Sequence, residues 1–511
     1  MSTAERRICV SICERDVRAV ITALKRAAEI GHFIEVRLDC INEGALTSGI
    51  ENLRQPLQEH ARSTIITFRP KEQGGLRPLT LDQRLQFWRE YGFGLPAFMF
   101  DLEIDLAEEV LRSGDSVDWS RVICSTHDFN ADVADVKNLY ERIARTPARF
   151  LKVAVMLDDA VDNVEMLKLI QRAASDDRKM IAIGMGSAGV PSRILGPSHG
   201  SFLTYASLDH HAATAPGQLT ASELRDTYRV EQITEATGVM GLIGHPITHS
   251  FSPRIHNAAF KSAELDAVYL PFDVSDLTSF MRRMVHPATR EIDWRLRGLS
   301  VTTPYKQNVM DHLDWIDPPA TNIGAVNTVV IDGKQLKGYN TDALGFISAL
   351  KTQRSGLNGI RCAVIGGGGA ARAAIWALLQ EGGKVSVFVR DIARARPLAD
   401  RFDVTIAELQ SAGFEGFDVV VNTTVLGMAG NQEQKTPANA AQLRGARLAY
   451  DLVYNPTETR FLREAEQVGC ETLGGLSMFV AQAAEQFRLW TGKEAPIEVM
   501  QTAALRALAK P

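Results

Sequence analysis

Short apolar runs rich in β-branched residues alternate with helical patterns through the first 210 residues of this chain. We expect strands at residues 8–13, 33–39, 63–69, 98–103, 121–128, 150–156, 180–186 and 202–207. Stretches such as residues 15–30 and 160–175 lie between them and have the apolar spacing of helices. This alternation predicts a parallel sheet. Eight units in a little over 200 residues favour a (β/α)8 TIM barrel, with an open doubly wound sheet as the alternative.

Composition excludes several classes of protein. The chain has 511 residues, 56 Lys and Arg against 61 Asp and Glu, and a net charge of −5. It therefore lacks the basic character of a protein that binds nucleic acid or an anionic membrane. No apolar run approaches the ~18 residues of a membrane-spanning helix. The N-terminal residues lack the apolar core of a secretory signal, so we expect a cytoplasmic protein.

The six cysteines and the histidines show no metal-site spacing. No Cys-x-x-Cys pair occurs, and the cysteines are too sparse for a disulfide framework. We expect reduced thiols and no bound metal.

Charged residues occupy one face of several predicted strands. Glu35 and Arg37 alternate with apolar neighbours, Asp101 and Glu103 share a face, and Lys152 sits within an apolar run. The outer face of a barrel strand packs on helices and must be apolar, so these charges should point inward. Barrel enzymes place their chemistry at the carboxyl ends of the strands. A salt-bridged plug inside the barrel is the purely structural alternative.

Lys152 and His127 stand out among these residues. Burial of a lysine favours the neutral amine, which is a nucleophile toward a carbonyl carbon. His127 ends the fifth predicted strand on the same side as Ser125. Together the two residues indicate Schiff-base formation with proton transfer.

The motifs of the first half resemble one family. They are Glu-Val-Arg-Leu-Asp (35–39), Thr-Phe-Arg-Pro (67–70), Ser-Thr-His-Asp-Phe (125–129), Lys-Val-Ala-Val (152–155), Arg193 and Ala-Pro-Gly-Gln (215–218). Over about residues 7–230 the chain resembles type I 3-dehydroquinate dehydratase. The resemblance implies that Lys152 forms an imine with the substrate ketone. His127 would remove a C2 proton and later protonate the departing C1 hydroxyl. The implied substrate-binding residues are Glu35, Arg37, Arg69, Arg193, Thr214 and Gln218.

Two positions depart from that family. Gln73 stands where the family has a glutamate directly before Gly-Gly, and Glu72 comes one place earlier. We expect either an altered pKa of His127 or a one-place loop shift that brings Glu72 in. Thr214 replaces the usual serine and keeps the hydroxyl.

A glycine-rich turn marks the second half. Gly366, Gly368 and Ala371 follow the predicted strand 360–365 and open a helix, as in dinucleotide-binding folds. Glycines there let the backbone approach a pyrophosphate at the helix N-terminus. Arg390 and Arg394 follow the next strand and suit a 2′-phosphate, which predicts NADP. Asp391 between them is the feature that would favour NAD, and exposed surface arginines are the alternative.

Several separated motifs resemble shikimate dehydrogenase over about residues 239–508. They span residues 243–253, 300–306, 324–328, 340–342, 422–424, 450–456 and 478–483. The resemblance implies that Lys306 and Asp342 assist hydride and proton transfer at the C3 carbonyl. The implied substrate-binding residues are Ser250, Ser252, Thr302, Asn327, Tyr454 and Gln482. The implied cofactor-binding residues are Gly366, Gly367, Gly368, Gly369, Ala370, Arg390, Arg394, Asn422, Thr423, Thr424 and Gly475.

These resemblances imply three domains and two consecutive reactions. We expect the barrel over 1–230, a substrate-binding lobe over 238–345 plus 476–511, and a Rossmann NADP-binding lobe over 346–475. The chain resembles the fused enzymes best known from plants, which convert 3-dehydroquinate to 3-dehydroshikimate and then to shikimate with NADPH. One alternative is a quinate and NAD preference in the second half. Another is a non-catalytic regulator that senses quinate or shikimate. The oligomeric state is not predicted.

Overall fold

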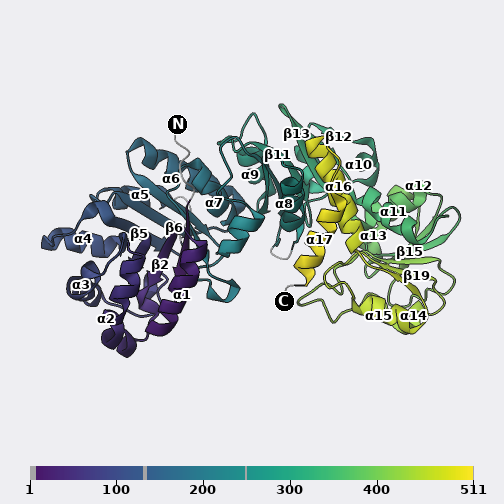
Figure 1. Ribbon diagram of the computed structural model, residues 1–511. Coiled ribbons are helices and arrows are strands. Elements are labelled where there is room, and N and C mark those ends of the chain that lie inside the picture. The colour runs from purple at the N-terminus through teal and green to yellow at the C-terminus, as the bar shows by residue number, and fades with distance from the viewer. Residues whose placement is uncertain (1–6, 131–134, 248–249, 510–511) are drawn as a thin grey trace. The chain divides into compact units, whose positions relative to one another are not determined.

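The computed structural model of the chain describes residues 7–130, 135–247 and 250–509, which form two compact units. The first unit runs to Thr237 and includes Leu270–Val285 and Thr289–Arg295. The second comprises Gly238–Tyr269, His286–Ala288 and the chain from Leu296 onward. In Figure 1 the chain colour runs from purple in the first unit to yellow at the end of the second.

Eight parallel strands form the sheet of the first unit. They are β1 (Ile8–Ile12), β2 (Phe33–Arg37), β3 (Thr64–Thr67), β4 (Met99–Glu103), β5 (Val122–Asp128), β6 (Phe150–Met156), β7 (Lys179–Met185) and β8 (Thr204–Ser207). Their order is β7-β6-β5-β4-β3-β2-β1-β8. The Phe202 amide donates to the Met180 carbonyl (2.7 Å), which joins the two edges. This nearly closed barrel confirms the predicted fold, and the open sheet was wrong.

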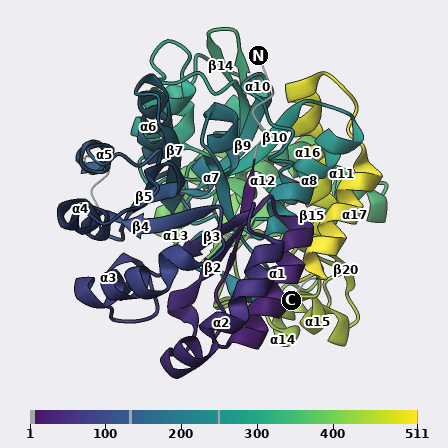
Figure 2. The same cartoon turned by 60° about the vertical axis from the view of Figure 1, so that its left-hand side comes forward.

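Helices follow the strands and lie around the barrel in Figures 1 and 2. They are α1 (Val17–Ile30), α2 (Glu43–Glu59), α3 (Leu81–Glu90), α4 (Ile104–Ser113), α5 (Val136–Ala144), α6 (Asn163–Ser175) and α7 (Val190–Leu195). Helix α1 shows why they form. The Asp16 carboxylate accepts a hydrogen bond from the Ala19 amide and caps the helix. Val20, Leu24 and Ala27 then recur on one face, which is buried.

The barrel interior has an apolar layer beneath a polar one. The apolar layer includes Cys9, Phe33, Ile65, Met99, Ile123 and Phe150. The polar layer comprises Ser11, Glu35, Thr67, Asp101, Ser125 and Lys152, all buried. Each polar residue follows an apolar one by two positions, so both share the inward face of their strand. The predicted inward direction of the charges is therefore confirmed.

Two six-stranded sheets follow along the chain. The first contains β9 (Gly238–Gly244), β10 (Ala267–Asp273), β11 (Leu296–Val301), β12 (Trp315–Ile316), β13 (Thr328–Asp332) and β14 (Gln335–Tyr339), in the order β10-β9-β11-β13-β14-β12. The second contains β15 (Arg361–Ile365), β16 (Lys384–Val389), β17 (Thr405–Glu408), β18 (Val419–Asn422), β19 (Leu448–Asp451) and β20 (Glu471–Leu473). Its order, β17-β16-β15-β18-β19-β20, is all parallel and matches the Rossmann topology.

The helices of this half are α8 (Ser252–Ser262), α9 (Leu277–Phe280), α10 (Pro318–Ile323), α11 (Asp342–Gln353), α12 (Gly369–Gln380), α13 (Ile392–Phe402), α14 (Ala440–Leu443), α15 (Arg460–Gln467), α16 (Leu476–Thr491) and α17 (Ile497–Leu508). Helix α16 follows the Rossmann strands but returns to the preceding sheet. The Trp490 indole N–H donates to the Val329 carbonyl of β13 (3.0 Å). The C-terminal helices therefore pack on the sheet that carries the predicted substrate residues.

A disulfide joins Cys13 and Cys40, so the expectation of reduced thiols was wrong for this pair. Cys13 follows β1 and Cys40 follows β2, and these strands are neighbours in the sheet. Their Cα atoms lie 5.2 Å apart although 27 positions separate them in the sequence. The spacing carried no signal because only strand pairing brings the two residues together. Cys9, Cys124, Cys362 and Cys470 are free and buried.

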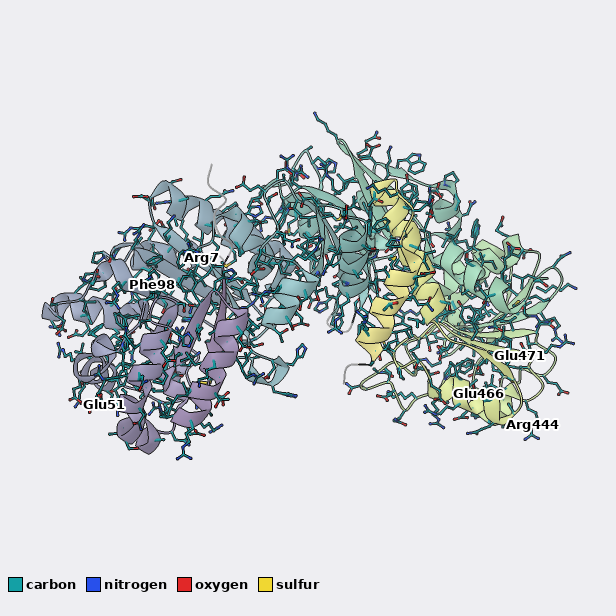
Figure 3. All side chains as sticks on the ribbon, in the orientation of Figure 1. Arg7, Glu51, Phe98, Arg444, Glu466 and Glu471 are labelled. Atoms are coloured by element: carbon teal, nitrogen blue, oxygen red, sulfur yellow. A yellow bond between two sulfur atoms is a disulfide. The ribbon has the colours of Figure 1, made fainter. Side chains whose placement is uncertain are left out.

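Membrane crossing and surface charge can both be judged from the described residues. No helix among them is long and apolar enough to cross a membrane. Charged side chains such as Glu51, Arg444 and Glu466 occupy exposed positions and project outward in Figure 3.

Candidate active sites

A pocket opens inside the barrel at the carboxyl ends of its strands. It is lined by every barrel residue that the sequence analysis assigned to a site: Glu35, Arg37, Arg69, His127, Lys152, Arg193, Thr214 and Gln218. They come from β2, the end of β3, β5, β6, α7 and the loop after β8. The barrel thus gathers residues that lie far apart in the sequence.

Lys152 lines this pocket and is 4% exposed. Its Nζ is 2.9 Å from Asp101 Oδ2 and 3.7 Å from Glu35 Oε1. It also lies 4.1 Å from the centre of the Tyr205 ring. Two carboxylates and an aromatic face therefore fix the position of the Lys152 amino group.

The sequence analysis missed the roles of Asp101 and Tyr205. Burial would raise the pKa of Asp101, but Arg69 and Lys152 outweigh it and hold the pKa below its ordinary value. The carboxylate therefore stays charged and binds both cations. Asp101 had been noted only as an inward-facing charge. Tyr205 lies in an apolar strand, and nothing in its sequence context marks it.

His127 is held in its neutral form. Burial lowers its pKa well below the ordinary value, and Arg69, Lys152 and Arg37 lower it further. The Arg69 guanidinium lies directly against the imidazole ring. A neutral imidazole can accept a proton, as a general base must.

Gln73 keeps the place of the family's glutamate. Its Oε1 accepts a hydrogen bond from the His127 main-chain amide (2.7 Å), and it lines the pocket. Glu72 is exposed and lies outside the pocket lining, so the predicted loop shift does not occur. The acceptor for the His127 main-chain amide is therefore a side-chain amide oxygen, that of Gln73, and not a carboxylate.

Arg193 is a buried cation that also lines the pocket and is 2% exposed. Burial lowers its pKa to about 10. Its Nη2 donates to the Pro216 carbonyl (3.1 Å), and its Nε has no partner among the described residues. The same loop carries Thr214, whose amide donates to Gln218 Oε1 (2.7 Å). A buried guanidinium with so few acceptors suits an anionic ligand.

In the second unit, Lys306 and Asp342 form a close ion pair. Lys306 Nζ lies 2.6 Å from Asp342 Oδ2, and both side chains are mostly buried. Thr302 begins the loop that carries Lys306. Asn327 accepts from the Thr341 amide (2.8 Å) and donates to the Thr341 hydroxyl (3.0 Å), which places it beside Asp342. The predicted catalytic pair and two predicted substrate residues therefore lie in neighbouring segments.

The two predicted carboxylate-binding serines are also paired. The Ser250 hydroxyl donates to Ser252 Oγ (3.2 Å) at the start of α8. Burial raises the pKa of Tyr454 to about 12, although a hydrogen bond with Ser250 opposes the rise. The Tyr454 ring stacks on Phe479 at 4.1 Å, and Gln482 Nε2 donates to the Phe479 carbonyl (2.9 Å). Helix α16 thus brings Tyr454 and Gln482 to one region.

The glycine-rich turn packs against Lys306. At Gly369 a Cβ would lie 2.9 Å from Lys306 Cδ. Gly366 has φ +121°, and a Cβ there would lie 2.5 Å from Thr423 Oγ1. The left-handed φ of Gly366 favours glycine, and at Gly369 a larger residue would displace the Lys306 side chain. The turn ends at the N-terminus of α12, where backbone amides suit a phosphate. The other predicted residues of this turn are Gly367, Gly368 and Ala370.

Arg390, Asp391 and Arg394 are all exposed at the start of α13. Asp391 Oδ1 accepts a hydrogen bond from the Arg394 amide (3.0 Å) and caps the helix. The carboxylate is therefore engaged by its own helix, while both guanidinium groups face solvent.

The remaining predicted cofactor residues border the turn. Asn422 is fully buried, and its Oδ1 accepts from the Thr424 amide (2.9 Å) and hydroxyl (2.7 Å). The Thr423 hydroxyl donates to the Ile365 carbonyl (2.8 Å). Gly475 directly precedes α16. The buried Asn422 side chain thus fixes the conformation of the loop that contains Thr423 and Thr424.

Within the described ranges, no group of His, Cys, Asp and Glu could hold a metal ion.

Three family models match the chain. A model described as type I 3-dehydroquinase matches residues 8–235. One for the shikimate dehydrogenase substrate binding domain matches residues 242–329, and one for the shikimate 5′-dehydrogenase C-terminal domain matches residues 475–505.

Known proteins with these activities are also similar to the chain. The chloroplastic bifunctional 3-dehydroquinate dehydratase/shikimate dehydrogenase of Arabidopsis thaliana is 34% identical, over 96% of this chain and 83% of that protein. The shikimate dehydrogenase (NADP(+)) of Moorella thermoacetica is 40% identical, over 54% of this chain and 96% of that protein. A solved shikimate dehydrogenase in complex with NADP+ has a TM-score of 0.51 and 37% identity, and covers 54% of this chain and 98% of its own.

Proposed function

This chain belongs to the family of bifunctional 3-dehydroquinate dehydratase/shikimate dehydrogenases, and we propose which of its residues carry out each of the two reactions. The first half dehydrates 3-dehydroquinate to 3-dehydroshikimate. The second half reduces 3-dehydroshikimate to shikimate. The domain division expected from the sequence, 1–230, 238–345 plus 476–511, and 346–475, is part of this proposal.

In the barrel, Lys152 is the nucleophile and His127 the base. The neutral Lys152 amine attacks the C3 ketone, water leaves and an imine forms. His127 takes up the C2 proton, and the electron pair of that C–H bond moves into the iminium to give an enamine. His127 then protonates the C1 hydroxyl, which leaves as water while the electron pair of the enamine re-forms the iminium. Water then hydrolyses the imine and frees Lys152. The observation that carries this assignment is that a buried lysine and a neutral histidine line one pocket with Arg193, whose charge suits the substrate carboxylate.

Trapping with borohydride tests this assignment. Reduction of wild type in the presence of 3-dehydroquinate should leave a stable adduct on Lys152, located by peptide mass. Lys152→Ala should lose both the adduct and the dehydratase activity. Lys179→Ala is the matched control, because Lys179 is exposed at the opposite end of a neighbouring strand. A Lys152→Ala protein that still dehydrates would disprove the imine.

In the second half, the substrate carboxylate is assigned to the hydroxyls of Ser250 and Ser252. Lys306 and Asp342 are assigned to the C3 oxygen, where Lys306 supplies the proton and Asp342 orients it. Thr302, Asn327, Tyr454 and Gln482 line the remaining ring positions. NADPH supplies the hydride when bound. The contact of Gly369 with Lys306 supports this assignment, because the glycine-rich turn lies against the lysine to which the reacting oxygen is assigned.

The preference for NADP is assigned to Arg390 and Arg394. Asp391 would compete for a ribose hydroxyl only if its carboxylate were free, and it caps α13 instead. Arg390→Ala should raise the KM for NADPH by at least about tenfold and leave the KM for NADH unchanged. Arg396→Ala, on the same helix and also exposed, is the control. Equal KM changes for both cofactors would refute the assignment of the 2′-phosphate to these arginines.

A cytoplasmic location stays a prediction that cell fractionation would test.

A further inference from the structure

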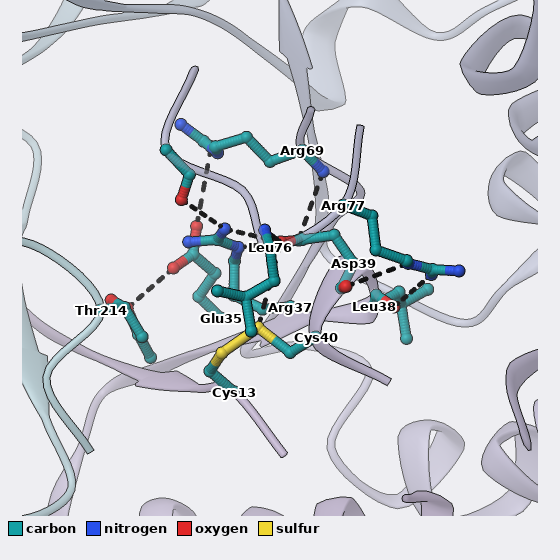
Figure 4. The surroundings of a disulfide bond; sticks show 12 residues. Cys13, Glu35, Arg37, Leu38, Asp39, Cys40, Arg69, Leu76, Arg77 and Thr214 are labelled. Carbon is teal, nitrogen blue, oxygen red and sulfur yellow. Dashed lines mark hydrogen bonds and ion pairs between the residues drawn. A yellow bond between two sulfur atoms is a disulfide. The ribbon is translucent and has the colours of Figure 1, made fainter. Parts of the chain in front are cut away.

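Asp39 lies behind the wall of the barrel pocket. It follows β2, is 1% exposed and does not line the pocket. The sequence analysis gave it no role in the site. Figure 4 shows its carboxylate among the residues that form the wall.

The Asp39 carboxylate holds three separate segments of that wall. Arg37 Nε and Nη2 donate to Oδ1 and Oδ2 at 2.8 and 2.7 Å, a two-pronged pairing. The Arg69 main-chain amide donates to Oδ1 (3.2 Å), and the Leu76 amide donates to Oδ2 (3.2 Å). Arg37 Nη2 also reaches the Gly74 carbonyl (3.1 Å). One carboxylate therefore fixes the guanidinium of Arg37, the backbone of Arg69, and the loop that follows Arg69.

The position of Asp39 is itself fixed from outside. Arg77 Nε donates to the Asp39 carbonyl (3.1 Å), and Arg77 Nη2 donates to the Leu38 carbonyl (3.0 Å). Cys40, the next residue, is tied to Cys13 by the disulfide. Burial would raise the pKa of Asp39, but Arg37 outweighs it and lowers the pKa below its ordinary value. The carboxylate is therefore charged at neutral pH.

We propose that Asp39 is a positioning residue of the dehydratase, which aims Arg37 and Arg69 at the polyhydroxylated carboxylate substrate. The inference rests on the proposed assignment of these two arginines to substrate binding. Asp39 binds the guanidinium of Arg37 but only the main chain of Arg69. The Arg69 guanidinium, which lies against His127, is held by Asp101, as is Lys152. Loss of Asp39 should therefore weaken substrate binding more than the chemical steps.

Asp39→Asn tests this role at nearly constant size. An amide offers one acceptor oxygen, and its NH2 group would face donors on Arg37 or Leu76. The KM for 3-dehydroquinate should rise at least about tenfold, while kcat falls less than about threefold. Asp115→Asn is the matched control, because Asp115 forms the same two-pronged pairing with Arg89 away from the pocket. The reductase activity of each variant should equal that of wild type, which would show that the second unit is folded.

A double-mutant cycle separates positioning from general damage. Asp39→Asn should raise KM much less in an Arg37→Met background than in wild type, because most of its effect passes through Arg37. An unchanged KM in Asp39→Asn, or effects that simply add, would overturn the positioning role. If Arg37→Met itself leaves KM unchanged, the substrate assignment fails instead. Should Asp39→Asn not fold, Arg77→Met replaces it, with a KM rise of about threefold expected and no rise counting against the proposal.

Discussion

Removal of the Cys13–Cys40 disulfide should destabilise the barrel unit selectively. The crosslink spans 27 positions. The loop-entropy relation for a crosslink of this span gives about 3.5 kcal/mol at 25 °C. In a unit of this size each kcal/mol shifts the unfolding midpoint by about 2–4 °C, so the midpoint should fall by about 7–14 °C. The second unit contains neither cysteine and should keep its own midpoint.

The two activities of the chain make this prediction measurable in one sample. Cys13→Ser/Cys40→Ser protein is heated in steps, and residual dehydratase and reductase activities are measured after each. Dehydratase activity should be lost at the lower temperature, while loss of reductase activity should follow wild type. Wild type treated with a thiol reductant should behave like the double variant. An unchanged dehydratase midpoint in both samples would refute the reasoning.

Three further predictions concern single positions. Gln73→Glu places a carboxylate beside His127, so it should raise the pKa of His127 and move the acid limb of the dehydratase pH profile upward; an unmoved limb would contradict this. Gly369→Ala should lower reductase kcat by about tenfold through displacement of Lys306, with dehydratase kcat unchanged as the control. Burial raises the pKa of Asp451 from 3.8 to about 6, so the folded state binds this proton more tightly than the unfolded chain does. The stability of the Rossmann fold should therefore fall by about 2 kcal/mol as pH rises from 4 to 6. Urea unfolding of wild type and Asp451→Asn should show that the variant lacks this slope.

The positions of the strands could be predicted, and the residues of two candidate sites could be proposed, because the signals are local. Alternating runs marked all eight barrel strands to within about two residues, and face parity predicted that Glu35, Arg37 and Lys152 point inward. The glycine turn predicted the nucleotide fold because strand, glycines and helix are contiguous. None of these inferences needs a contact between distant segments.

The sequence by itself determined where the elements lie, which residues face the barrel axis and which family motifs the chain carries. Only the tertiary structure decided what surrounds those residues. Asp101 beside Lys152, the amide of Gln73 on His127 and the Cys13–Cys40 bond all join segments from different strands. Such pairings depend on strand register and closure of the sheet, which are set by packing of the whole barrel. A local pattern cannot encode them, because each partner looks ordinary until the fold brings the other within reach.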